Sequence, residues 1–217
     1  MSEISQLLRA RTREKQVRVF LNGKFAFSLQ AEAAVKEGLR IGQELTDSRV
    51  DALVKSERYR RCLAAAVRYL GYRPRSEAEV RDRLHRRGFA GEDIEAVMAK
   101  LKEQGFVDDA AFVRFWTENR DSFSPRSQRL TRLELTKKGV HKELVDRVVG
   151  AVDDKDSAYR AAIAKARRLP LSDYQLFRRR LGDYLRRRGF SYEVANQAIS
   201  LTWKELGGLG QGSSDDA

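Results

Sequence analysis

The sequence predicts a mainly α-helical protein: three tandem three-helix repeats forming an elongated curved array, preceded by a small N-terminal α+β unit with one β-hairpin. Three observations support this prediction. A six-residue block recurs three times at a spacing of 50 or 51 residues, every apolar stretch beyond residue 56 has helical spacing, and one strong hairpin signal lies near the N-terminus. At 217 residues and 41% hydrophobic content, the chain can bury a core.

The hairpin signal lies in residues 17–29, where two β-rich runs flank Asn22 and Gly23. This pair suits a type I′ turn, because both of its positions need positive φ. A short helix is expected over 31–37, and Thr46 begins the signal for another helix. Since an isolated hairpin is marginally stable, it should pack on these helices.

The recurring block has the pattern Leu-x-x-x-Gly followed by Phe or Val. Its three copies are Leu84–Phe89, Leu135–Val140 and Leu185–Phe190, each followed three residues later by a glutamate: Glu92, Glu143 or Glu193. The upstream tripeptide Pro74-Arg75-Ser76 recurs as Pro125-Arg126-Ser127 and is absent before the third copy.

Each block is predicted to be a helix end closed by a Schellman motif. With Gly88 in the left-handed conformation, Leu84 and Phe89 occupy the two positions that make its apolar contact. The glutamate that follows then lies in the first turn of the next helix, where the helix dipole favours a negative charge. The other two copies predict the same arrangement.

The predicted organisation follows from these repeats. Units of about 50 residues are too small to bury their apolar faces alone, so neighbouring units should stack. The predicted segments are an N-terminal unit of hairpin and helices over 1–55, repeats over 56–107, 108–155 and 156–206, and a disordered tail over 207–217.

The charge gives the first functional hint. The chain carries 43 Lys and Arg against 31 Asp and Glu, a formal charge of +12, which attracts polyanions such as nucleic acids. The excess of basic residues is unevenly distributed along the chain. Residues 156–206 hold 11 basic and 5 acidic residues, whereas residues 108–155 hold 10 basic and 9 acidic residues. The third repeat is therefore the most basic.

Two readings of the recurrent cations stay open. Cations in the last turn of a helix offset the negative end of its dipole, which accounts for them without any partner. In mid-helix, however, Arg179 aligns with Arg186 and Arg180 with Arg187, giving two exposed stripes that capping does not explain. The predicted partner- or DNA-binding residues are Arg75, Arg86, Arg87, Arg126, Lys137, Lys138, Arg178, Arg179, Arg180, Arg186, Arg187 and Arg188.

No catalytic, cofactor or metal site is predicted. Cys62 is the only cysteine, and His85 and His141 have no partner in register for a zinc site. No nucleotide-binding or hydrolase motif is present. Trp116 is interpreted as packing, and two Asp pairs, Asp108-Asp109 and Asp153-Asp154, as helix N-caps. No apolar run reaches the roughly 18 residues of a membrane span, and no signal peptide is apparent, so the expected location is the cytoplasm.

Several segments together resemble the RecX family, the bacterial regulators of the RecA recombinase. They are Leu70–Val80, Arg87-Gly88-Phe89, Gly105–Phe112 and Arg187–Ser191, and the resemblance covers roughly residues 59–206. One departure is Gly71, where the family often has alanine. The resemblance implies three tandem three-helix repeats, no enzyme activity, and binding along the RecA–single-stranded-DNA filament. There such a protein restrains recombination and the self-cleavage of the SOS repressor, which places it in DNA repair and the SOS response.

Other classes of function remain open at this point. The first alternative is a helix-turn-helix module that reads duplex DNA, and a further one is an enzyme with an unfamiliar site. For the regulator, the expected partners are the RecA filament and, through weak direct contact, single-stranded DNA. No membrane partner is expected, and the absence of an exposed heptad seam favours a monomer.

Overall fold

A computed structural model describes the backbone of residues 1–9 and 16–209. Within these residues the chain forms ten helices and one four-stranded antiparallel sheet, so it is mainly α-helical as predicted. It divides into two compact units, one of residues 1–73 and 80–106, the other of residues 74–79 and 107–217. No helix in the described part of the chain has the length and apolar character to cross a membrane.

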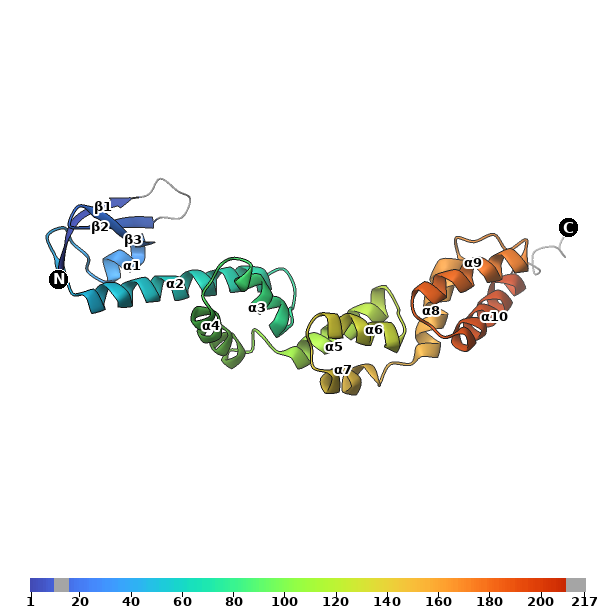
Figure 1. Cartoon of the computed structure of the whole chain (residues 1–217). Helices are drawn as coiled ribbons and strands as arrows, with labels where there is room; N and C mark the ends of the chain where they lie inside the picture. The colour runs from blue at the N-terminus through green and yellow to red at the C-terminus, as the bar shows by residue number, and fades with distance from the viewer. Residues whose placement is uncertain (10–15, 210–217) are drawn as a thin grey trace. The chain divides into compact units, whose positions relative to one another are not determined.

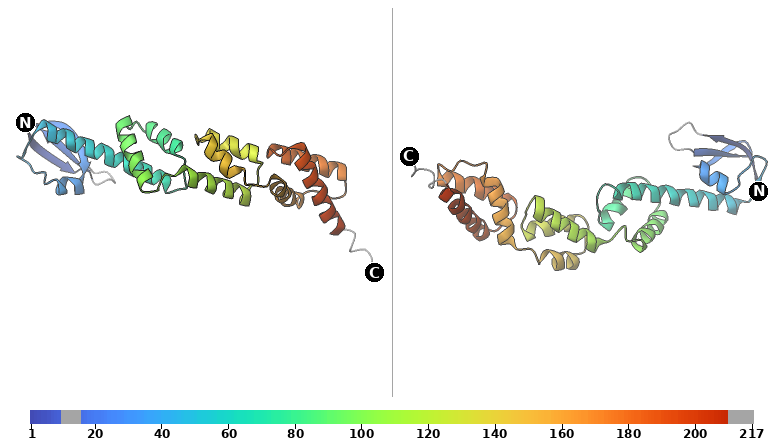
Figure 2. Two further views of the ribbon diagram at one scale, coloured as in Figure 1. Left: turned by 90° about the horizontal axis from the view of Figure 1, so that it is seen from below. Right: turned by 180° about the vertical axis from the view of Figure 1, so that it is seen from behind.

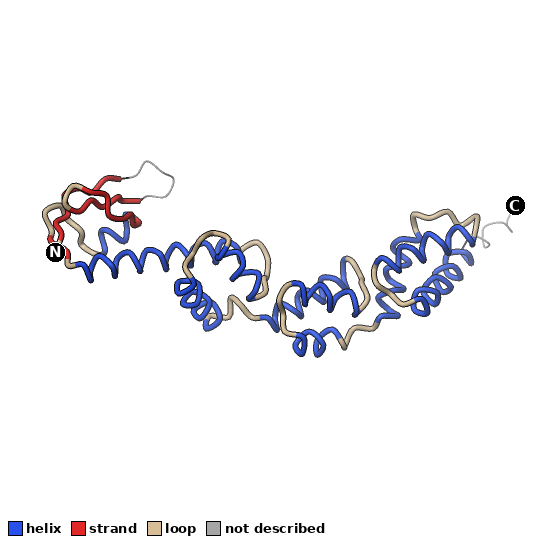
Figure 3. Tube along the Cα trace, viewed as in Figure 1, coloured by secondary structure: helices blue, strands red, loops and turns tan. Residues whose placement is uncertain are grey.

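The N-terminal sheet has the strand order β3-β2-β1-β4, and Figure 3 shows its strands in red. The strands are β1 (Ser2–Arg9), β2 (Gln16–Leu21), β3 (Lys24–Gln30) and β4 (Glu44–Leu45). Asn22 and Gly23 have φ of 50° and 79°, which confirms the predicted turn between β2 and β3.

The sheet is larger than the hairpin expected from the sequence. In β1 the register shifts between Ile4 and Gln6. This irregularity breaks the strict alternation that identifies a strand, so β1 was missed. β4 has only two residues, too few to give a pattern.

Helix α1 (Ala31–Lys36) and the start of α2 (Asp47–Leu70) lie beside the sheet (Figure 1). Thr46 caps α2, its side chain accepting a hydrogen bond from the backbone N–H of Arg49 at 3.2 Å. The predicted boundary between the N-terminal unit and the first repeat, at residues 55 and 56, lies inside α2, which is one helix of 24 residues. Along the C-terminal part of α2, Cys62 and Ala66 are buried, whereas Val67 is exposed.

The remaining helices form the three-helix repeats. The first repeat combines the C-terminal part of α2 with α3 (Glu77–His85) and α4 (Gly91–Glu103). The second contains α5 (Asp109–Phe123), α6 (Gln128–Lys137) and α7 (Lys142–Val149); the third contains α8 (Asp154–Ala166), α9 (Tyr174–Arg187) and α10 (Tyr192–Leu209). Figure 2 shows α8, α9 and α10 grouped in both views. Because α10 extends to Leu209, the predicted tail begins later than 207, and residues 210–217 lie outside the described part.

All three predicted Schellman motifs are present. In the first, the N–H of Phe89 donates to the carbonyl of Leu84 at 3.3 Å and that of Gly88 to His85 at 2.9 Å. The same pairs of hydrogen bonds recur in the second and third copies, and Gly88, Gly139 and Gly189 have φ of 78°, 74° and 87°. Six local residues therefore determine each of these turns.

Candidate partner-binding surface

The predicted cations divide into a group held by other parts of the protein and a group exposed to solvent. The held group comprises Arg75, Arg126, Lys138 and Arg188, which are all half-buried. The exposed group comprises Arg86, Arg87, Lys137, Arg178, Arg179, Arg180, Arg186 and Arg187.

Lys138 and Arg75 converge on Glu79. Lys138 Nζ lies 2.9 Å from the Glu79 Oε1 atom and 4.3 Å from the centre of the Trp116 ring, and Arg75 lies 3.8 Å from the same carboxylate. The carbonyl of Lys138 also accepts a hydrogen bond from Ser76 Oγ at 2.6 Å. Lys138 thus joins the segment before α3 to the second repeat.

Arg188 has the same role one repeat later. Its guanidinium donates to Ser124 Oγ at 3.0 Å and to the carbonyl of Pro125 at 2.8 Å, and it lies over the Tyr184 ring. Its own carbonyl accepts from the N–H of Ser127 at 3.0 Å. These contacts join the second and third repeats.

Arg126 belongs to a cluster around the Glu134 carboxylate. Glu134 accepts from Arg126, from Arg120 Nε at 2.9 Å and from Trp116 Nε1 at 3.0 Å. Burial lowers the pKa of the Arg126 guanidinium, with smaller contributions from the charges of Arg120 and Arg188. Trp116 is therefore a packing residue, consistent with its interpretation from the sequence.

The paired aspartates perform two different tasks. Asp108 and Asp153 cap their own helices, α5 and α8, as predicted. The next residue of each pair instead reaches the preceding repeat: Asp109 accepts from the N–H of Glu77 at 2.8 Å, and Asp154 from that of Gln128 at 2.7 Å. This second task requires knowledge of which helices are neighbours, so the sequence pattern could not reveal it.

Five of the predicted cations are exposed on one helix of the third repeat and are here called the basic face: Arg178, Arg179, Arg180, Arg186 and Arg187 on α9. The opposite side of α9 is core, since Phe177, Leu181 and Leu185 are fully buried. Arg186 pairs with Asp183 at 2.8 Å, and Arg178 contacts the Tyr192 hydroxyl at 3.4 Å. The side chains of Arg179, Arg180 and Arg187 make no hydrogen bond or ion pair with any described residue.

The other exposed cations predicted from the sequence lie outside α9. Arg86 pairs with Asp82 at 2.8 Å, as expected of a surface i,i+4 pair, and Lys137 is exposed at the end of α6. Arg87 lines a hollow of about 210 Å³ in the first unit, together with Arg60, Arg61 and Arg68 of α2. Those three arginines were not predicted, although Arg61 and Arg68 have the same i,i+7 spacing as Arg179 and Arg186.

No group of three or more potential metal ligands occurs among the residues that the structure describes. The fold and the exposed cations define a class: a basic helical protein of tandem three-helix repeats, attached to a small antiparallel sheet. Two domain models of one family match inside these repeats, "RecX, first three-helix domain" at residues 62–101 and "RecX, third three-helix domain" at residues 153–199. The chain belongs to the RecX family.

Curated relatives match nearly the whole chain. A protein of Clostridium beijerinckii named "Regulatory protein RecX" is 26% identical over 204 residues, covering 92% of this chain and 95% of its own. A protein of the same name from Bacillus licheniformis is 27% identical over 206 residues, covering 93% of this chain and 78% of its own.

Solved structures share the fold. One, titled "Crystal structure of regulatory protein RecX", has a TM-score of 0.61 and 20% sequence identity, covering 92% of this chain and all of its own. RecX from Lactobacillus salivarius has a TM-score of 0.57 and 20% identity, covering 68% of this chain and 97% of its own.

Proposed function

We propose that this chain is a non-catalytic regulator that binds the RecA–single-stranded-DNA filament and mainly inhibits the ATPase, strand-exchange and coprotease activities of RecA. Family membership and relatives named as regulatory proteins support the proposal. The observation that carries it within this chain is the basic face of the third repeat.

The basic face suits a polyanionic partner because much of its charge is not neutralised within the protein. Cations arranged at i,i+7 on one side of a helix repel one another, and a solvated face usually mixes signs. Here Asp183 is the acidic residue on the exposed side of α9, and it already pairs with Arg186. A filament of DNA and protein supplies negative charge along its length.

The alternative of a helix-turn-helix reader of duplex DNA is disfavoured by charge. A recognition helix places its N-terminal residues against base edges between the phosphates. The helices that follow the three Gly turns each carry an acidic first turn, with Glu92 and Asp93 in α4, Glu143 in α7 and Glu193 in α10. These carboxylates would meet the phosphate backbone with like charge.

Three further parts of the proposal concern the state of the protein. It acts as a monomer, it contacts single-stranded DNA directly but weakly, and it resides in the cytoplasm with RecA. The cations that serve the DNA contact in this proposal are those of the basic face and those that line the hollow of the first unit: Arg60, Arg61, Arg68 and Arg87.

The proposal is tested by reversing Arg179, Arg180 and Arg187 to Glu together. These side chains are exposed and make no hydrogen bond or ion pair within the described residues, so the fold should be retained. Affinity for RecA filaments on poly-dT, measured by fluorescence anisotropy of the labelled chain, should fall at least about tenfold.

A matched control carries the same change of charge on the N-terminal unit, where Lys24, Lys36 and Arg40 are exposed. Reversing those three should reduce affinity by no more than about threefold, because long-range attraction between exposed charges is screened by salt. Equal loss in both variants, or retained affinity in the α9 variant, would refute a role for the basic face.

A further inference from the structure

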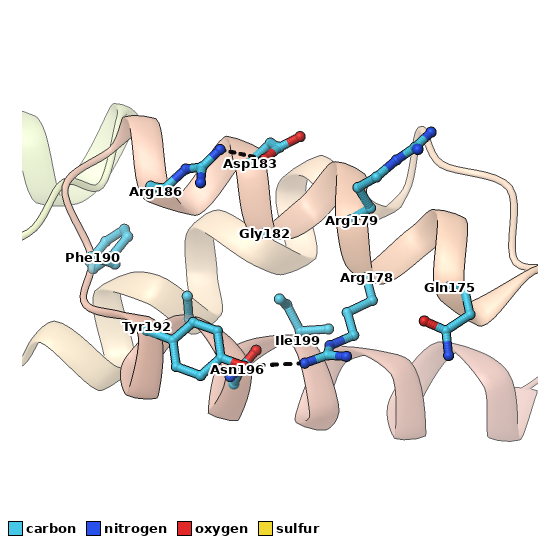
Figure 4. A pocket seen from close by; sticks show the side chains of 11 residues that line it. Gln175, Arg178, Arg179, Gly182, Asp183, Arg186, Phe190, Tyr192, Asn196 and Ile199 are labelled. Atoms are coloured by element: carbon cyan, nitrogen blue, oxygen red, sulfur yellow. Dashed lines mark hydrogen bonds and ion pairs between the residues drawn. The ribbon is translucent and has the colours of Figure 1, made fainter.

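The basic face borders a groove between α9 and α10 with a volume of about 310 Å³, shown in Figure 4. Its floor is apolar: Phe190 is 5% exposed, Ile199 is 2% exposed, and Gly182 leaves the α9 side without a side chain. Its rim carries Arg178, Arg179 and Arg186. A volume near 300 Å³ is at the lower limit of ligand-binding clefts and can receive a large side chain.

The same position in the first two repeats is crossed by an ion pair between the second and third helices. In the first repeat Arg81 on α3 binds Glu95 on α4, with one N–O distance of 3.0 Å. In the second repeat Arg132 on α6 binds Asp146 on α7 at 2.9 Å.

In the third repeat the equivalent residues, 50 positions after Arg132 and Asp146, are Gly182 and Asn196. Gly182 has no side chain to reach across, and Asn196 carries no charge to attract one. Figure 4 shows the two residues on facing helices with Ile199 between α9 and α10. The second repeat has a hollow of about 330 Å³ at the equivalent place, but there Arg132 and Asp146 line it and pair with each other. Among the described residues, the α9–α10 groove lacks such an ion pair, and the Arg178 guanidinium instead contacts the Tyr192 hydroxyl at 3.4 Å.

The groove combines an apolar floor with a positively charged rim. Asp183 is the acidic residue of its lining and is already paired with Arg186, which leaves a net positive rim. The phosphates of a DNA backbone would pair with the arginines of the rim but would leave the apolar floor exposed to water. A peptide segment in which an apolar side chain stands beside carboxylates would satisfy both.

We propose that the α9–α10 groove is a docking site for an acidic protein segment that inserts one apolar side chain. The inference rests on the proposed function, with the segment lying on the protein subunits of the filament and not on its DNA. The basic face then supplies attraction, and the groove supplies the position at which the two proteins interlock.

The test is to cover the apolar floor of the groove with two longer side chains that can pair as Arg81 and Glu95 do in the first repeat, using the double variant Gly182→Arg and Asn196→Glu, here called the covered variant. The net charge is unchanged, so electrostatic attraction is preserved. A Cβ atom at Gly182 would lie 3.6 Å from Ile199 Cδ1, an ordinary contact, so the backbone accepts a side chain there. Affinity for RecA filaments on poly-dT should fall at least about tenfold, while affinity for naked poly-dT stays within about twofold of the wild type.

The matched control removes the corresponding pair from the second repeat with Arg132→Gly and Asp146→Asn. It changes the same residue types without altering the third repeat, and filament affinity should stay within about threefold. Unchanged filament binding by the covered variant would overturn the inference. So would a parallel loss of naked poly-dT binding, which would identify DNA as the occupant. If the wild type did not bind the filament at all, the proposed function itself would fail.

A second measurement does not depend on how well the covered variant folds. Tyr192 stands at the edge of the groove and is 76% exposed, so a photoreactive benzoylphenylalanine replaces it readily. Irradiation of the complex should attach the chain to the RecA subunit. Attachment to DNA alone, or no attachment in a complex that binds normally, would contradict a protein occupant.

Discussion

Lys138 and Arg188 occupy the same place in the helix-end block as Arg87, yet their surroundings differ. Lys138 contacts Glu79 and Trp116, and Arg188 contacts Ser124 and Pro125, whereas the side chain of Arg87 makes no hydrogen bond or ion pair with described residues. The partners of Lys138 and Arg188 lie about 60 residues away in the chain. Sequence comparison of the blocks identified these cations but could not separate the half-buried structural ones from the exposed ones. That distinction depends on which residues of the neighbouring repeat lie beside each cation.

Cys62 offers a test of burial at the residue scale. Its side chain is fully buried, and desolvation, with a smaller contribution from the Asp93 carboxylate, raises the pKa of its thiol to about 11. An unfolded cysteine titrates near pH 8.5. Between roughly pH 8.5 and pH 11 the unfolded chain therefore releases a proton that the folded chain retains.

The predicted consequence is a loss of stability as the pH rises through that window. The contribution is fully present below about pH 8.5 and should decrease by about 3 kcal/mol toward pH 11. Urea unfolding at a series of pH values measures it, and the Cys62→Ala variant controls for lysines and tyrosines that titrate in the same range. Identical slopes for both proteins would show that the thiol does not contribute.

At the scale of elements, the sequence predicted the local turns and helix ends correctly, but it did not locate where every helix and strand begins and ends. The Asn22-Gly23 turn and the three Schellman motifs depend on a few adjacent residues, and all are present. The predicted boundary near residue 55 falls inside α2, which no Gly or Pro interrupts, so one helix contributes to both the sheet and the first repeat. β1 was missed because its irregular register conceals the alternation of a strand.

The glycines of the helix-end blocks provide the test at this scale. All three have positive φ, but an added Cβ at Gly88 would meet nothing within 4 Å, whereas at Gly189 it would lie 2.5 Å from Ser127 Oγ and 2.8 Å from Leu130 Cβ. Gly88→Ala should therefore cost only the strain of the left-handed conformation, about 1 kcal/mol. Gly189→Ala should cost about 3 kcal/mol, because the preceding repeat must also move.

Urea denaturation of the two single variants beside the wild type measures the difference. The pair is matched, since both replace a glycine at the C′ position of the same motif. Equal destabilisation would mean that the contact between Gly189 and α6 does not constrain the second and third repeats.

At the scale of the whole molecule, the sequence predicted the class of fold and the most basic repeat. The excess of positive charge in residues 156–206 corresponds to the exposed arginines of α9. The α9–α10 groove was not predicted, because Gly182 and Asn196 are unremarkable residues until they are compared with the ion pairs at the same positions of the other repeats. In a repeat protein, equivalent positions of the repeats can be compared with one another. A contact that is present in two repeats and missing in the third indicates that the third has a different role.

The central claim is that this chain regulates RecA by acting on its filament. The most direct test measures the single-stranded-DNA-dependent ATPase of the cognate RecA while this chain is titrated from far below equal stoichiometry up to it. A regulator that acts on an assembled filament should inhibit at amounts well below one chain per RecA subunit, and the Arg179, Arg180 and Arg187 reversal should weaken that inhibition. An ATPase rate that is unchanged even at equal stoichiometry would contradict the account.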